Sequence, residues 1–118
     1  MKSLIVTADD YAMSAAIDDG IVDLMHAGRL SGTACMTFSP RWPEAARRFS
    51  PDLQARCAMG LHLDLTEFAA PPAAASAAST SAQLFAKPFA LRTVILHAYA
   101  RRLDTAKLRA TVAAQLDR

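Results

Sequence analysis

Short apolar segments alternate with segments of helical periodicity along the first half of this chain. Residues 4–6 (Leu-Ile-Val) lie between Ser3 and Thr7, a pattern that predicts a short strand buried on both faces of a parallel sheet. Residues 33–38 predict a second strand, and residues 58–65 predict a third. Strands that alternate with helices are typical of βαβ units, so we expect an α/β fold with a parallel sheet and flanking helices.

The helix predicted after the first strand has a recognisable signal at each end. Ser14 is a candidate N-cap and Gly28 a candidate C-cap. Asp18 and Asp19 fall in the first turns, where the helix dipole favours anions. The apolar positions between the caps recur at helical spacing: Ile17, Ile21, Leu24 and Met25.

Two further segments are predicted before the third strand. Residues 43–49 predict a short helix that has Pro43 near its first position. Residues 51–56 are predicted to form a loop that leads into the third strand.

The second half of the chain predicts a loop followed by a helical tail. Residues 69–82 are a low-complexity tract of Ala, Pro and Ser, which predicts a loop. Residues 91–118 predict two helices, the second capped by Asp104. Their apolar positions are Leu91, Val94, Ile95 and Tyr99 in the first helix and Leu108, Val112 and Leu116 in the second. Because the helical pattern still continues at Arg118, we expect residues 1–118 to be a single N-terminal segment of a longer domain.

Composition and charge exclude several classes of protein. With 118 residues, 53% of them hydrophobic, the chain is large enough for one small domain with a core. Its net charge of +2 is too small to predict nucleic-acid or membrane-surface binding. No apolar run approaches the roughly 20 residues that span a bilayer, and no signal-peptide core follows Lys2. We therefore expect a cytoplasmic protein with no membrane or nucleic-acid partner.

The two cysteines do not predict a metal or redox site. Cys35 and Cys57 lack the close spacing of a zinc knuckle or a redox dithiol. We expect each to be a small buried apolar residue, with a disulfide between them as the alternative.

An acidic pair follows the first predicted strand, and a histidine lies near the end of the third. Parallel sheets bind ligands beyond the carboxyl ends of their strands, so Asp9, Asp10 and His62 are candidates for one site. Adjacent residues of an extended strand point to opposite sides, so the two acids are expected to have different tasks. One would bind a cation while the other accepts a proton from water. Two ligands are fewer than the three of a typical catalytic zinc site.

Structural roles for the same residues remain open at this point. The aspartates could cap the chain or be solvated, and the histidine could be an ordinary hydrogen-bonded side chain. Asp64 shares a strand face with His62 by its period of two. It could orient the imidazole, or it could be a loop acid near Thr66.

Several motifs in a fixed order resemble one known family. They are residues 4–11 (Leu-Ile-Val-Thr-Ala-Asp-Asp-Tyr), Ser14, the helix that ends at Gly28, Ser31-Gly32-Thr33, Ser39-Pro40, and residues 60–66 (Gly-Leu-His-Leu-Asp-Leu-Thr). This series is similar to the YdjC-type carbohydrate deacetylases, which include chitooligosaccharide deacetylases and hopanoid-biosynthesis-associated members. The resemblance covers residues 2–66 well and the tail only loosely.

The resemblance implies a divergent (β/α) barrel and a metal-dependent hydrolase. Its substrate would be an N-acetylated sugar or oligosaccharide, and its cofactor a divalent metal, Zn or Mg. Position by position, Asp9 matches the general base, while Asp10 and His62 match two metal ligands. The family's third ligand is a histidine in a later histidine-rich motif that this sequence lacks. Neither His26 nor His97 matches it.

These implications set expectations for the chain as a whole. A (β/α)₈ barrel takes about 250 residues, roughly twice this length. Three strands cannot close a barrel, and exposed sheet edges pair readily with other chains, so association of two copies is an option. We expect the polypeptide by itself to be weakly active or inactive.

Two other classes of function compete with the deacetylase. A receiver-like phosphoacceptor domain also has an acidic pair after its first strand, and Asp64 would be its phosphorylated residue. Residues 69–82 stand where that fold needs a compact loop, and Lys87 and Lys107 have no strand setting. The third class is a non-catalytic fragment that binds a partner through its helical tail or an open sheet edge.

Overall fold

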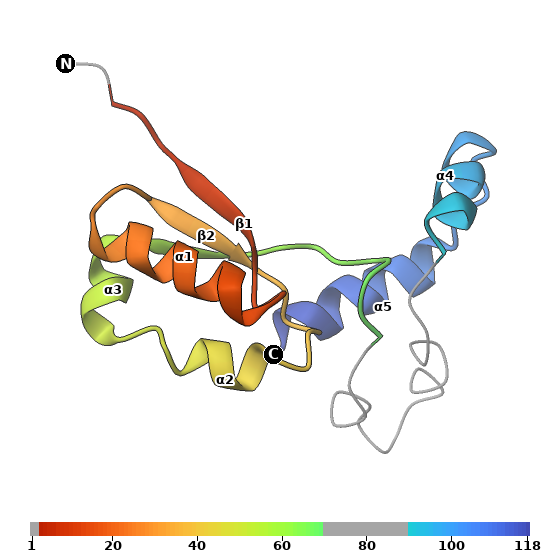
Figure 1. Ribbon diagram of the computed structural model, residues 1–118. Helices are drawn as coiled ribbons and strands as arrows, with labels where there is room; N and C mark the ends of the chain where they lie inside the picture. The colour runs from red at the N-terminus through yellow and green to blue at the C-terminus, as the bar shows by residue number, and fades with distance from the viewer. Residues whose placement is uncertain (1–2, 70–89) are drawn as a thin grey trace. The chain divides into compact units, whose positions relative to one another are not determined.

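The computed structural model describes residues 3–69 and 90–118, in two compact units, Met1–His62 and Leu63–Arg118. Among these residues, the elements of the first unit are β1 (Thr7–Tyr11), α1 (Ala15–His26), β2 (Gly32–Cys35), α2 (Trp42–Ala46), α3 (Pro51–Arg56) and β3 (Ala58–Leu61) (Figure 1). Those of the second unit are α4 (Leu91–Tyr99) and α5 (Thr105–Leu116).

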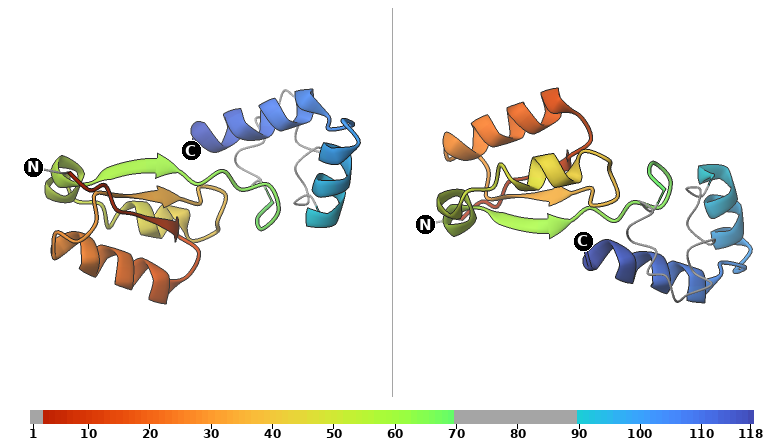
Figure 2. Two further views of the ribbon diagram at one scale, coloured as in Figure 1. Left: turned by 90° about the horizontal axis from the view of Figure 1, so that it is seen from above. Right: turned by 90° about the horizontal axis from the view of Figure 1, so that it is seen from below.

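The strands of the first unit form one parallel sheet in the order β1-β2-β3, with β2 in the middle (Figure 2). Helix α1 contacts β1, and α3 contacts β3. These findings confirm the α/β class, the parallel sheet and the flanking helices. The closed barrel implied by the resemblance stays a prediction.

The first strand does not lie where the apolar run predicts it. Leu4 and Ile5 are 82% and 79% exposed, and β1 begins only at Thr7. The reason is the register, since Thr7 pairs with Gly32, the first residue of β2. Before that point the backbone of Val6 bonds only to Ser31, whose N–H donates to the Val6 oxygen at 2.7 Å. The two carboxylates therefore lie within the strand and not after it.

The second and third strands are shorter than predicted. After Cys35 the chain turns, and the Ser39 N–H donates to the Met36 oxygen at 3.0 Å. Strand β3 ends at Leu61, although the His62 N–H still reaches the Cys35 oxygen at 2.9 Å. The prediction extended too far because apolar residues continue beyond the last paired position.

Helix α1 confirms the predicted N-cap, whereas its C-cap is Ala27, one residue before the predicted Gly28. The Ser14 hydroxyl accepts the Ile17 N–H, and Gly28 follows the helix with φ +66°, a conformation that glycine adopts without strain. One of its four predicted core positions is wrong, because Leu24 is 47% exposed. Val22 is buried instead, beside Ile21 and Met25.

The segment between β2 and β3 contains two short helices. Helix α2 ends at Ala46, three residues before the predicted end. Residues 51–56, predicted as a loop, form α3. The Ser50 hydroxyl accepts the Leu53 N–H at 3.3 Å, and Pro51 occupies a first-turn position where a missing N–H costs nothing.

The core of the first unit packs between the sheet and its helices. Tyr11 is fully buried, donates its hydroxyl to the Ala45 oxygen at 2.8 Å, and meets the Phe49 ring edge to face at 5.1 Å. Cys35 and Cys57 are buried as free thiols, which confirms the prediction made for them. The other buried apolar residues of this cluster are Ala12, Ile21, Val22, Met25, Ala45 and Leu53.

In the second unit both predicted helices form, but their buried positions differ from the prediction. Asp104 caps α5 by accepting the Lys107 N–H at 2.9 Å. No residue of α4 is buried, and α5 buries Thr111 and Gln115 while Leu116 is 66% exposed. The predicted loop at residues 69–82 lies, from residue 70 onward, outside the described residues. No helix of the described residues is long and apolar enough to cross a membrane.

Candidate functional site

A bulge in β1 places the acidic pair. Ala8 pairs with Thr33 and Tyr11 with Cys35, so three steps along β1 correspond to two steps along β2. The extra residue falls at Asp9-Asp10, and Asp10 has a left-handed φ of +66°. Bulges of this kind redirect side chains and are frequent beside active sites.

Asp10 and His62 lie in direct contact, although 52 residues separate them in sequence. The Asp10 backbone N–H donates to His62 Nδ1 at 3.2 Å, and Asp10 Oδ1 also lies 3.2 Å from that nitrogen. Both side chains are partly exposed, at 45% for Asp10 and 30% for His62. The parallel order of β1, β2 and β3 brings them together, because all three strands end at the same edge of the sheet.

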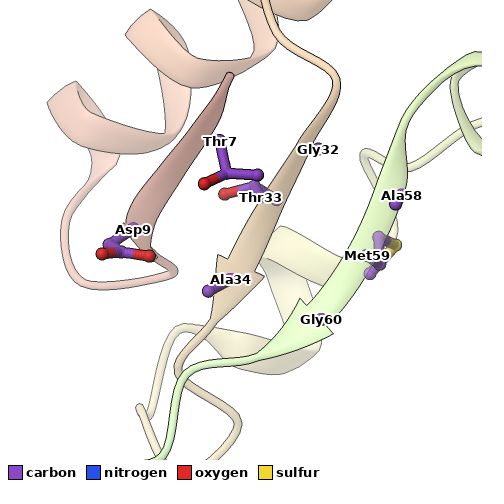
Figure 3. A pocket seen from close by; sticks show the side chains of 8 residues that line it. All are labelled: Thr7, Asp9, Gly32, Thr33, Ala34, Ala58, Met59 and Gly60. Carbon is purple, nitrogen blue, oxygen red and sulfur yellow. The ribbon is translucent and has the colours of Figure 1, made fainter. Parts of the chain in front are cut away.

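The surroundings of the Asp9 side chain differ from those of Asp10 and His62. Ala8, its neighbour in β1, packs against the core cluster, while Asp9 is exposed and lines a shallow cavity on the sheet (Figure 3). The cavity has a volume of about 220 Å³. Its other lining residues are Thr7, Gly32, Thr33, Ala34, Ala58, Met59 and Gly60. The two acids thus have different surroundings, and the bulge at Asp9-Asp10 replaces the regular alternation expected from the sequence.

The pair Asp10 and His62 fits two ligands of a divalent metal. Metal bonds of about 2.0–2.1 Å at a tetrahedral angle separate two ligand atoms by about 3.3 Å. Oδ1 and Nδ1, 3.2 Å apart, match this separation. The one lone pair of Nδ1 accepts the Asp10 N–H in the metal-free chain, so a metal bound at Nδ1 would take the place of this hydrogen bond. Within the described residues, no group of three His, Cys, Asp or Glu side chains gathers at one point.

The turn after the acidic pair is held by a buried polar network. The Met13 N–H donates to the Asp10 oxygen at 3.0 Å, which closes a turn that has Ala12 at φ +76°. The Ala12 N–H donates to Asp18 Oδ1 at 2.7 Å, and the Ser39 hydroxyl donates to the Ala12 oxygen at 2.5 Å. Arg41 donates from Nε and Nη2 to Asp18 Oδ2 at 3.3 and 3.0 Å.

Burial or a hydrogen bond shifts the pKa of three groups around this turn. Burial raises the pKa of the Tyr11 hydroxyl from 10.0 to about 12. Burial, with a smaller contribution from the Asp18 charge, raises the pKa of the Cys35 thiol from 9.0 to about 11. The side-chain hydrogen bond to Asp18 raises the pKa of the Arg41 guanidinium.

Comparison with known proteins assigns the chain to a family. The model of the family described as YdjC-like protein matches residues 3–118. The chain belongs to the YdjC-like family. A carbohydrate deacetylase of Enterococcus faecalis (strain ATCC 700802 / V583) is 37% identical over 68 residues, which cover 55% of this chain and 24% of that protein. The YdjC-like chain thus spans about a quarter of that relative's length. No solved structure matches it.

Asp64 has a structural role in this YdjC-like chain. Its Oδ1 accepts the N–H groups of Thr66 and Glu67, and its Oδ2 accepts that of Phe68, all at 2.8–2.9 Å. Asp64 is 4% exposed and lies three residues beyond the end of β3. This agrees with the loop acid considered from the sequence. It does not fit a phosphoacceptor, which needs an accessible carboxylate at the end of a central strand.

Sequence reasoning missed the network around Ala12. Asp18 was interpreted only as a charge favoured by the helix dipole, yet it is fully buried. A signal was present, because Asp18 lies three, four and seven residues before Ile21, Val22 and Met25, on the apolar face of α1. An acid on that face needs a buried partner. Nothing in the sequence identified Arg41 as that partner.

Proposed function

We propose that this YdjC-like chain carries part of the active site of a metal-dependent carbohydrate deacetylase. The observation that supports it most strongly is the contact between Asp10 and His62, which presents an oxygen and a nitrogen donor 3.2 Å apart. The family assignment and the partial match to a carbohydrate deacetylase support the same reaction class. The substrate in this proposal is an N-acetylated sugar or oligosaccharide.

Each residue has a distinct role in the proposal. Asp10 and His62 hold a divalent metal, Zn or Mg. A divalent metal supplies, when bound, a lowered pKa for water and a polarised acetyl carbonyl. Asp9, which matches the general base of the family in sequence, would accept the proton of the attacking water and return it to the leaving amine.

Two protein ligands also explain why we expect the chain by itself to be weakly active. A catalytic zinc site holds its metal with three protein ligands. The described residues bring two together. In this proposal a further donor from outside the described residues completes the site.

Calorimetric titration with zinc tests the proposal. We expect His62→Ala to lower the zinc affinity by about tenfold or more, because one of two chelating donors is lost. His26→Ala is the matched control, since His26 is an exposed histidine at the end of α1 in the same unit. Equal zinc affinity of the wild type and His62→Ala would exclude His62 as a ligand.

The same titration separates the base from the ligands. We expect Asp9→Asn to bind zinc within about twofold of the wild type, because in the proposal Asp9 holds no metal. Asp10→Asn should weaken binding as His62→Ala does. A loss of affinity in Asp9→Asn equal to that in Asp10→Asn would make Asp9 a ligand and leave the base unassigned.

A further inference from the structure

We infer that Asp18 is a positioning residue for Asp10, and that it acts through the peptide of Ala12 with the help of Ser39 and Arg41. The inference rests on the proposed function in so far as Asp10 is a metal ligand. It adds a set of side chains that keep the Asp10 carboxylate against His62. Within the described part of the chain, the side chain of Asp18 bonds to Ala12 and Arg41 and not to Asp10 or His62.

The backbone near Asp10 has a conformation that is unfavourable by itself. Asp10 and Ala12 both have left-handed φ angles, +66° and +76°, and neither is glycine. Side chains with a Cβ avoid this region. The conformation therefore needs contacts that stabilise it from outside the segment.

The polar network supplies those contacts at one residue, Ala12. Asp18 Oδ1 accepts the Ala12 N–H at 2.7 Å, while the Ser39 hydroxyl donates to the Ala12 oxygen at 2.5 Å. Both polar groups of Ala12, a fully buried residue, are thus satisfied by side chains. The two contacts come from two different elements, α1 and the segment after β2, so they fix the orientation of Ala12.

Several hydrogen bonds within the network hold its own side chains in place. Arg41 donates twice to Asp18 Oδ2, and its own N–H donates to the Ser39 hydroxyl at 3.1 Å. Asp18 is fully buried, and burying a carboxylate is expensive unless every lone pair has a partner. Asp18 meets this requirement with the Ala12 N–H on Oδ1 and Arg41 on Oδ2, while Ser14 caps the helix itself.

One turn of the backbone connects Ala12 to the candidate metal site. The Met13 N–H to Asp10 oxygen bond makes Asp10 and Ala12 part of one turn. The orientation of that turn sets the direction of the Asp10 N–H and carboxylate, both of which lie 3.2 Å from His62 Nδ1. Freeing the Ala12 peptide is therefore expected to separate Asp10 from His62.

The experiment measures the Asp10 to His62 contact directly in the metal-free full chain. A nitrogen–nitrogen coupling across the Asp10 N–H to Nδ1 hydrogen bond, recorded by NMR, reports the contact in folded molecules only. We expect Asp18→Ala to lose this coupling and to bind zinc about tenfold or more weakly. Asp18→Asn keeps an acceptor for the Ala12 N–H and should restore the coupling.

Asp19→Ala is the matched control. Asp19 is the next residue of α1 and forms an ion pair with Arg48 at 2.8 Å, but it does not contact Ala12. It should behave as the wild type in both measurements. A merely structural role for Asp18 would lower the thermal midpoint of Asp18→Ala but leave the coupling of the folded fraction intact, and that result would overturn the inference.

If Asp18→Ala does not fold, Ser39→Ala decides the question, because it releases the other side of the same peptide. Weakening of the coupling in Ser39→Ala supports the inference, and an unchanged coupling contradicts it. The outcome is separable from that of the proposed function. Zinc binding that is insensitive to His62→Ala would remove the metal role while the coupling still tested the positioning.

Discussion

At the scale of single residues, the candidate site depends on left-handed backbone conformations that its residue types do not predict. Asp-Asp-Tyr-Ala contains no glycine, yet Asp10 and Ala12 are left-handed. The strand ends predicted Asp9, Asp10 and His62 as candidates for one site, and the family resemblance implied that Asp10 and His62 are its two ligands. The structure brings Asp10 and His62 into contact. The bulge, and the support that Asp18 gives to it, could not be predicted, because they depend on tertiary hydrogen bonds between α1 and the segment after β2.

Burial of Cys35 and Tyr11 makes the fold sensitive to alkaline pH. Each pKa is raised in the folded chain, from 9.0 to about 11 for Cys35 and from 10.0 to about 12 for Tyr11. Since the unfolded chain ionises first, the stabilisation is complete below pH 9 and is lost as the pH rises through the folded values. We expect Cys35→Ala to flatten the decline of the urea midpoint between pH 9 and 11. A wild-type slope in Cys35→Ala would contradict the assignment.

At the scale of elements, the ends of helices were easier to predict than the ends of strands. Ser14 and Asp104 were recognised as caps because a side-chain acceptor before a helical pattern acts locally. Strand ends depend on where a neighbouring strand stops, and this is not encoded in the strand itself. Helix α3 was missed because its six residues bury only Leu53, too few for a periodic signal.

The two glycines Gly32 and Gly20 make a matched pair for testing the β2–β3 packing. A Cβ at Gly32 would lie 2.6 Å from the Ala58 backbone oxygen, whereas a Cβ at Gly20 in α1 meets nothing within 4 Å. We expect Gly32→Ala to lower the free energy of unfolding by about 1–3 kcal/mol. Gly20→Ala should raise it by about 0.5–1 kcal/mol, because alanine favours the helix. Urea denaturation measures both, and equal effects would argue against the close strand approach.

At the scale of the whole molecule, an ordered series of short motifs was more informative than composition. The order of residues 4–11, Ser14, Ser39-Pro40 and residues 60–66 indicated the YdjC-like family, and the family match confirms it. Amphipathic periodicity was less reliable in the second unit. There Gln115 is buried and Leu116 exposed, because the Gln115 amide holds both backbone groups of Asp64, at 2.9 and 2.5 Å.

Gln115 should therefore matter more to the second unit than its apolar neighbour does. We expect Gln115→Ala to destabilise α5 by about 1–3 kcal/mol, because two buried backbone groups lose their partners. Leu116→Ala removes a side chain that is 66% exposed and should change the stability by less than about 0.5 kcal/mol. Hydrogen exchange of the α5 amides measures both variants. A larger effect of Leu116→Ala would show that apolar packing dominates this unit.

The central claim is that Asp10 and His62 bind one metal ion together. A double-mutant cycle of zinc affinity, with Asp10→Asn, His62→Ala and the double variant, tests it most directly. If both side chains hold the same ion, each single change removes the chelate, and the double variant binds little more weakly than either single one. Losses that simply add would place the two residues at separate sites, and unchanged affinity in all three variants would contradict the metal site itself.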